Sequence, residues 1–171
     1  NTEVLGDVAY PTASGYLSVP SGARNLKVNA ANTASSVIDA TPTLAAGKSY
    51  SVLAVNFLSS IEALVLEDDR TPVDGKARVR VVHASPDAPN VDVLANDTAV
   101  LTNVPFKAAS DYLDVDPGDY VFKLNAAGTA TTAFTSPTLT LEAGKVYTAV
   151  AIGSLASEAT NALTIKVLVD N

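Results

Sequence analysis

Three residues of the types found in a hydrolytic triad lie close together in this chain, at His83, Ser85 and Asp87. A triad works only when its members converge in three dimensions, and residues this close on one strand-to-turn segment are poorly placed to do so. By alternation, His83 shares the inward face of Val79 and Val81, so we expect a histidine hydrogen-bonded at the edge of a core. With one His and no Cys in the chain, the sequence predicts no catalytic residue and no enzymatic activity.

Carboxylates gather a little further along the chain. Asp114 and Asp116 point to one face of an expected strand, and hard cations such as Ca²⁺ want several oxygen ligands, so the pair is a weak calcium candidate. The acidic stretch is Asp111, Asp114, Asp116 and Asp119, and its counterparts in an internal repeat are Gly15, Ser18, Pro20 and Ala23. The fold therefore does not need these carboxylates, and a solvated acidic face is the simpler interpretation, as it is for the run Glu67–Asp69. We predict no cofactor.

The elements that carry these residues are expected to be strands, because apolar residues recur with period two between short turns. The predicted strands are Val4–Val8, Tyr16–Val19, Asn25–Val28, Thr41–Leu44, Tyr50–Phe57, Ala63–Leu66, Arg78–Val81, Val91–Val93, Thr98–Val104, Tyr112–Asp116, Tyr120–Leu124, Thr138–Leu141, Val146–Ile152 and Leu163–Val169. An Asn96-Asp97 turn should join two of them in a hairpin. Without an amphipathic helix of useful length, this pattern predicts antiparallel β-sandwiches, with seven or eight strands in the second.

The chain also repeats itself. Val4-Leu5 returns at positions 100–101, Tyr16-Leu17 at 112–113 and Asn29-Ala30-Ala31 at 125–127, so each pair of positions differs by 96. After one inserted residue the difference becomes 97, as between Gly47-Lys48 and Gly144-Lys145. A period this long indicates two similar domains. We predict a first domain over residues 1–69, a linker over 70–76 and a second domain over 77–171.

The two copies differ at their beginnings. The second copy opens with two strand-like segments within Ala77–Ala95, and nothing in the given sequence takes their place ahead of the first copy. We therefore expect the first domain to lack its opening strands, with an open core and an unpaired edge of the kind that recruits other strands. The predicted assembly edge consists of Thr2, Val4, Leu5, Val8, Tyr16, Leu17 and Leu26.

The segment Val79–Val93, which reads Val-Arg-Val-Val-His-Ala-Ser-Pro-Asp-Ala-Pro-Asn-Val-Asp-Val, resembles the signature of a bacterial extracellular family, the domain of unknown function numbered 4397. The pattern continues through Val100–Phe106, Tyr112, Pro117–Phe122 and Glu142–Tyr147. The resemblance implies immunoglobulin-like β-sandwiches, often in tandem, in secreted or surface-attached bacterial proteins. It implies no reaction.

Composition narrows the classes of partner. The net charge is −7 and Lys and Arg are few and scattered, which disfavours nucleic acid. There is no apolar run of about 18 residues, so we expect no membrane insertion. The resulting hypothesis is a structural protein of the cell surface that self-associates or joins another surface protein, a neighbour's strand completing the first domain. The alternatives are a module whose sandwich loops bind a glycan or a protein, and a chain whose first strands were cleaved or lost.

Overall fold

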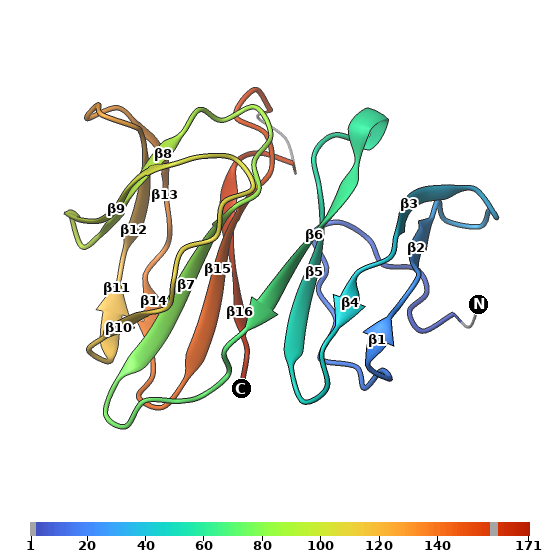
Figure 1. Ribbon diagram of the computed structural model, residues 1–171. Coiled ribbons are helices and arrows are strands. Elements are labelled where there is room, and N and C mark those ends of the chain that lie inside the picture. The colour runs from blue at the N-terminus through green and yellow to red at the C-terminus, as the bar shows by residue number, and fades with distance from the viewer. Residues whose placement is uncertain (1–2, 158–160) are drawn as a thin grey trace. The chain divides into compact units, whose positions relative to one another are not determined.

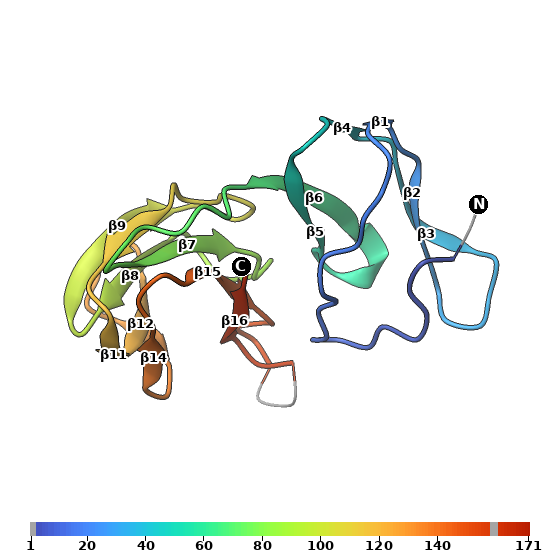
Figure 2. The same ribbon diagram turned by 90° about the horizontal axis from the view of Figure 1, so that it is seen from below.

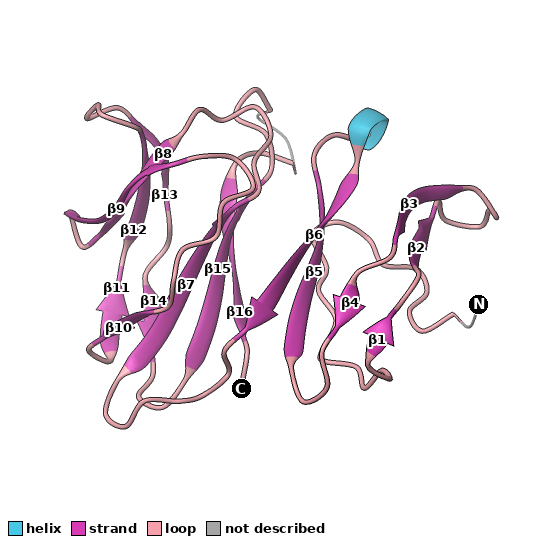
Figure 3. Ribbon diagram, in the orientation of Figure 1, coloured by secondary structure: helices cyan, strands magenta, loops and turns pink. Residues whose placement is uncertain are grey.

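The computed structural model describes residues 3–157 and 161–171 (Figure 1). The chain divides into two compact units, of which unit 1 comprises Asn1–Ala54 and Leu58–Asp68 and unit 2 comprises Val55–Phe57 and Asp69–Asn171. Apart from one short 3-10 helix, η1 (Leu58–Ser60), the regular elements of the described residues are β-strands (Figure 3). The all-β class predicted from the period-two pattern is therefore confirmed.

Unit 2 is built from two four-stranded sheets and one short strand pair (Figures 1 and 2). Its strands are β7 (Ala77–His83), β8 (Val91–Ala95), β9 (Thr98–Val104), β10 (Leu113–Val115), β11 (Gly118–Tyr120), β12 (Phe122–Ala126), β13 (Thr132–Thr135), β14 (Leu139–Leu141), β15 (Val146–Ile152) and β16 (Thr164–Val169). One sheet has the order β10-β7-β15-β16 and the other the order β13-β12-β8-β9, while β11 pairs with β14. Apolar side chains of both four-stranded sheets share a single core.

Two features of unit 2 bear on the predicted pairing. The β8–β9 hairpin turns at Asn96 and Asp97, whose φ angles of 47° and 65° give the left-handed conformation that tight hairpin turns need. The expected purely antiparallel arrangement is wrong at one place, because β7 and β15 pair in parallel. These two strands come from opposite ends of the unit, and the chain between them passes through the second sheet, which provides the long crossover that parallel pairing requires.

Unit 1 contains shorter and fewer paired strands. They are β1 (Gly22–Ala23), β2 (Leu26–Asn29), β3 (Ser36–Ala40), β4 (Thr43–Leu44), β5 (Ser49–Val55, of which the last residue falls in unit 2) and β6 (Glu62–Asp68). Within the described residues they pair only two by two, as β1-β4, β2-β3 and β5-β6. The repeat aligns β1 to β5 with β11 to β15, so unit 1 contains the second part of the unit 2 topology.

Two predicted strands of unit 1 are not strands in the structure. Val4–Val8 and Tyr16–Val19 form no ladder, although their counterparts β9 and β10 do. In unit 2, β9 pairs with β8 and β10 pairs with β7, and unit 1 has no described equivalent of either partner. A period-two sequence becomes a strand only when its backbone groups find a partner, which explains the difference.

The cores of the two units differ accordingly. In unit 2 the buried cluster includes side chains of β7, β8, β12 and β15, such as Val81, Val93 and Leu124. In the described part of unit 1, the only buried apolar side chains are Ile38 and Leu44. Unit 1 therefore keeps strand pairs but has almost no sealed interior.

Candidate strand-acceptor site

The first component of the site is the free edge of β5. Its counterpart β15 lies between β7 and β16, whereas β5 pairs with β6 alone among the described strands. Val52 of β5 is 49% exposed, but the equivalent Ala149 of β15 is only 3% exposed because it lies opposite Val81 of β7. β5 thus has the unpaired backbone edge and the exposed apolar face that β15 would have if β7 were removed.

The second component is the corresponding edge of β2. Its counterpart β12 pairs with β13 on one side and β8 on the other, whereas β2 has β3 as its single partner within the part of the chain that the structure describes. Val28 of β2 is 42% exposed, while the equivalent Leu124 is completely buried opposite Val93 of β8. Both open edges of unit 1 therefore lie where the segment Ala77–Ala95 lies in unit 2.

All but one of the predicted assembly-edge residues belong to the segment that precedes β1. Five of them are between 41% and 66% exposed although they are large and apolar, namely Val4, Leu5, Val8, Tyr16 and Leu17. Leu26, the first residue of β2, is half-buried. Thr2 lies outside the described residues. The counterparts of this apolar segment in unit 2 include β9 and β10, which pair with β8 and β7.

A pocket opens within unit 1 beside β4. Its lining includes Val19, Leu44 and Tyr50. The counterparts of these three residues belong to, or pack against, the core of unit 2. Two of those counterparts pair in register with Ala77 and Val79, the first part of β7. Relative to the equivalent residues, the pocket therefore lies where the first part of β7 lies in unit 2.

Sequence reasoning missed a polar cluster around the buried carboxylate of Asp68, at the end of β6. The Tyr16 hydroxyl donates to Asp68 Oδ2 at 2.8 Å and Ser51 Oγ donates to the same oxygen at 2.9 Å. The expectation that the run 67–69 is simply solvated is wrong for Asp68, which is 6% exposed. The matching residue at the end of the second copy is Asp170, and a different loop length before it hid the equivalence.

Comparison with known families agrees with this picture of two related units. The model of the family described as Domain of unknown function (DUF4397) matches residues 1–94 and 77–171, which together span the chain. The chain belongs to the DUF4397 family. The resemblance predicted from the segment Val79–Val93 is thereby confirmed, and both matches include the whole of that segment.

Other comparisons add little to the family assignment. The solved C-terminal domain of AlgF from P. aeruginosa is 16% identical to this DUF4397 chain, with a TM-score of 0.37, and the match covers 56% of this chain and 99% of that one. No curated protein sequence matches the chain. No helix in the described residues has the length and apolar character needed to cross a membrane.

The histidine and serine of the DUF4397 signature segment do not face each other as a catalytic pair. His83 Nε2 lies 3.1 Å from the carbonyl oxygen of Pro89, and Ser85 Oγ donates to the carbonyl oxygen of Gly153 at 2.7 Å. Both residues are completely buried, and burial lowers the pKa of the His83 imidazole below its usual value. The hydrogen bonds of these two side chains connect the end of β7, and the segment that follows it, to Pro89 and Gly153.

Asp87, the third residue of that apparent triad, organises a loop. It accepts hydrogen bonds from Ser154 Oγ at 2.6 Å and from the backbone amides of Leu155 and Ala156 at 2.9 and 3.1 Å. Burial raises the pKa of Asp87, but the hydrogen bonds from Ser154 and the two amides outweigh this effect and lower the pKa overall. The carboxylate thus fixes the loop after β15.

The calcium candidates are each engaged with a cation of unit 2. Asp114 Oδ1 lies 3.1 Å from Arg78 Nε, and Asp116 Oδ1 lies 2.6 Å from Lys76 Nζ. No group of three or more His, Cys, Asp or Glu side chains placed to hold a metal ion occurs in the described residues. The structure therefore uses these carboxylates to hold β7 and the residue before it.

Proposed function

We propose that this DUF4397 chain is a non-enzymatic structural protein of the bacterial cell exterior, secreted or attached to the surface, and that it assembles by accepting a β-strand segment from a neighbouring subunit into unit 1. The observation that carries the proposal is the contrast between the two copies. Val28 and Val52 are 42% and 49% exposed, whereas their counterparts in unit 2 are sealed by β7 and β8. Both units are, on this proposal, versions of one immunoglobulin-like β-sandwich.

Physical reasoning supports acceptance of a strand over permanent exposure. An unpaired strand edge with an apolar face is a template for pairing with another chain, and natural proteins normally cover or disrupt it. Unit 1 presents two such edges, and each of the two open strands carries an exposed apolar side chain, Val28 on β2 and Val52 on β5. Strand addition would supply both the missing backbone hydrogen bonds and the missing half of the core. Repeated from subunit to subunit, a contact of this kind is heterologous and produces a fibre.

The test compares assembly of the intact protein with that of two variants. Val52→Lys puts a charge on the open face of β5, and Leu155→Lys places the same charge on a similarly exposed loop residue of unit 2. We expect regular oligomers or filaments by light scattering and electron microscopy for the wild type and for Leu155→Lys. We expect Val52→Lys to remain monomeric, with the unit 2 resonances of its NMR spectrum unchanged.

Two outcomes would overturn the proposal. One is a wild-type protein that stays monomeric at micromolar concentration, including the case in which a further segment of the same polypeptide occupies the edge. The other is assembly of Val52→Lys with wild-type yield and morphology.

A further inference from the structure

A second feature lies at the end of unit 2 where β7 and β15 finish, and it is independent of assembly through unit 1. Because these strands pair in parallel, with His83 opposite Ala151, the segments that follow them leave the sheet at the same end (Figure 1). The amide of Ala84 donates to the carbonyl oxygen of Ala151 at 2.8 Å. Beyond this backbone bond, polar side chains connect the segment 84–90 to the segment 153–157.

His83 determines how the segment 84–90 folds back on the end of β7. Its Nδ1 accepts a hydrogen bond from the Ser85 amide at 3.4 Å, so Nε2 carries the proton and donates to the carbonyl oxygen of Pro89 at 3.1 Å. The imidazole is completely buried, and the ring of Phe106 stands edge-on to it with the ring centres 6.2 Å apart. The neutral ring therefore holds two points of the same segment through one donor and one acceptor.

Two polar side chains of this segment bind the chain that follows β15. Ser85 Oγ donates to the carbonyl oxygen of Gly153 at 2.7 Å, and Asp87 accepts hydrogen bonds from Ser154 Oγ and from two amides of the same loop. We refer to His83, Ser85 and Asp87 together as the latch. The positions of the last two depend on the fold of the segment 84–90, and hence on the two hydrogen bonds of the His83 ring.

A second proton on His83 is incompatible with this arrangement. It would sit on Nδ1, towards which the Ser85 amide already points its own hydrogen, so two donors would face each other. The positive charge would also lie on a completely buried ring, which has a large desolvation cost. Burial accordingly lowers the pKa of His83. The closed latch therefore requires the neutral imidazole.

The charges around His83 do not compensate for a second proton. Lys107, on the segment that packs against the ring through Phe106, is itself a cation, and β15 places Ala151 beside His83. Asp87 is the carboxylate of the segment 84–90, and three donors of the loop after β15 already bind it. Although burial raises the pKa of Asp87, these hydrogen bonds lower it overall, so this carboxylate stays ionised between about pH 5 and pH 7.

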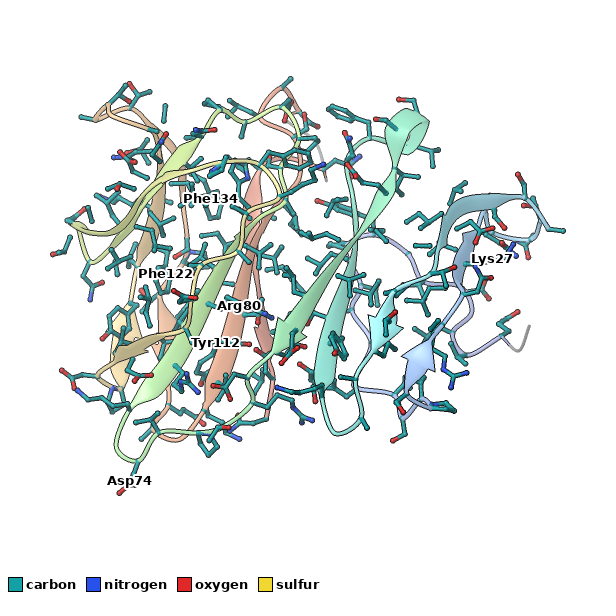
Figure 4. All side chains as sticks on the ribbon, in the orientation of Figure 1. Lys27, Asp74, Arg80, Tyr112, Phe122 and Phe134 are labelled. Atoms are coloured by element: carbon teal, nitrogen blue, oxygen red, sulfur yellow. The ribbon has the colours of Figure 1, made fainter. Side chains whose placement is uncertain are left out.

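We propose that the latch is a conformational switch that mild acid opens: protonation of His83 releases the segment 84–90 from the loop after β15, and neutral pH closes it again. The core between the two sheets stays folded, because its packing rests on apolar side chains such as Phe122 and Phe134 (Figure 4). Opening exposes apolar surface at this end of unit 2, including the buried side chains of Ala84 and Ala88.

The size of the effect follows from proton linkage. In the open latch His83 is in water and titrates near its ordinary pKa of 6.5, whereas in the closed latch it titrates at a lower pH. If only the open form binds the proton, the ratio of open to closed latch rises about 25-fold between pH 7 and pH 5, and binding to the closed form makes the rise smaller. The closed latch is therefore fully stable above about pH 6.5 and loses stability below it.

The test is amide hydrogen exchange of the intact protein by NMR, expressed as protection factors, which remove the intrinsic effect of pH on exchange. The amides of Leu155 and Ala156, which bind Asp87, report the closed latch. We expect their protection to fall by between about threefold and 25-fold from pH 7 to pH 5, with the fall beginning near pH 6.5. In dilute urea their protection should stay nearly constant while that of the Ala149 amide in the core decreases, because latch opening exposes little surface.

Two variants separate the histidine from the carboxylate. In His83→Gln the side chain keeps a donor for the Pro89 carbonyl oxygen but gains no proton, so protection of the two reporter amides should be equal at pH 7 and pH 5. In the matched control Asp87→Asn, protection should be lower at both pH values, but the ratio between them should stay at the wild-type value because His83 is intact. The wild-type profile is decisive even if His83→Gln folds poorly, since an opening driven by a carboxylate would begin near about pH 4.

Four results would overturn the proposal. Two concern the wild type, namely reporter protection that is equal at pH 7 and pH 5, and a fall that begins only near about pH 4. The third is a loss of reporter protection in urea as steep as that of the Ala149 amide, because the reporters would then exchange through global unfolding. The fourth is a folded His83→Gln protein that retains the wild-type ratio of protection between the two pH values.

Discussion

Truncating one equivalent residue in each unit measures how open unit 1 is in the unassembled chain. Leu124 of β12 is completely buried, whereas the equivalent Val28 of β2 is 42% exposed. Removing three buried carbons by Leu124→Ala costs about 2.4 kcal/mol in transfer alone, and the cavity left behind brings the expected loss to about 2–5 kcal/mol. Removing two carbons by Val28→Ala should cost at most about 0.9 kcal/mol, because much of the side chain is already in water.

The assay is urea unfolding of the full chain followed by NMR, in which amides of β12 and β2 report the two units separately. With a urea dependence of about 1–3 kcal/mol per molar, Leu124→Ala should lower the unit 2 midpoint by about 0.7 M or more, and at the same urea dependence Val28→Ala should shift the unit 1 midpoint by less than half as much. A Val28→Ala loss equal to that of Leu124→Ala would refute the reasoning, since it would mean that β2 already packs in a sealed core.

Three further predictions concern titration and metal binding. The single histidine, His83, should titrate by NMR with a midpoint below 6.5, because burial lowers its pKa. As the pH falls below about 6.5 the unfolded chain binds the proton before the folded chain does, so the free energy of unfolding should decrease. A midpoint at or above 6.5 would contradict the buried position of His83. Hydrogen bonds from Thr71 hold the pKa of Asp69 at about 2, so the stabilisation that Asp69 provides is present above about pH 4 and is lost as the pH falls towards 2. In Asp69→Asn, the free energy of unfolding should depend less on pH over that range. The same pH dependence in the variant and the wild type would argue against the contact. Because Asp114 and Asp116 are both held in ion pairs, we expect them to provide no calcium site. Calorimetric titration with Ca²⁺ should therefore give the same result for the wild type and for an Asp114→Asn, Asp116→Asn double variant. A saturable Ca²⁺ site that is present in the wild type and lost in the variant would reverse this conclusion.

Strand content was the most predictable feature of this protein. Segments such as 78–81 and 146–152 alternate β-branched residues with others, an order typical of β-strands, although both faces of β7 and β15 are buried in the structure. The strands that were missed are β1, β3, β11 and β13, which have only two to five residues each, too few for a clear period-two signal. Unit 2 consequently has ten strands in its described residues, more than the seven or eight predicted, the additional ones being β11 and β13.

The open edge was predictable in outline and not in detail. The repeat showed which segments lack counterparts, because equal spacing can be read without a structure. It did not show that Val4–Val8 and Tyr16–Val19 lose their strand conformation, since an alternating sequence specifies a strand only together with its hydrogen-bonding partner. Nor did it reveal the parallel pairing of β7 with β15, which joins strands far apart in the chain.

The sequence by itself determined the all-β class, the two related copies and the family, because these depend on local alternation and on spacing along the chain. Only the tertiary structure decided which polar groups act together. Asp68 reads as one carboxylate in a charged run, yet it is buried and accepts hydrogen bonds from Tyr16 and Ser51, which lie at distant points in the chain. Such a cluster has no sequence signature, because folding and not spacing brings its members within hydrogen-bonding distance.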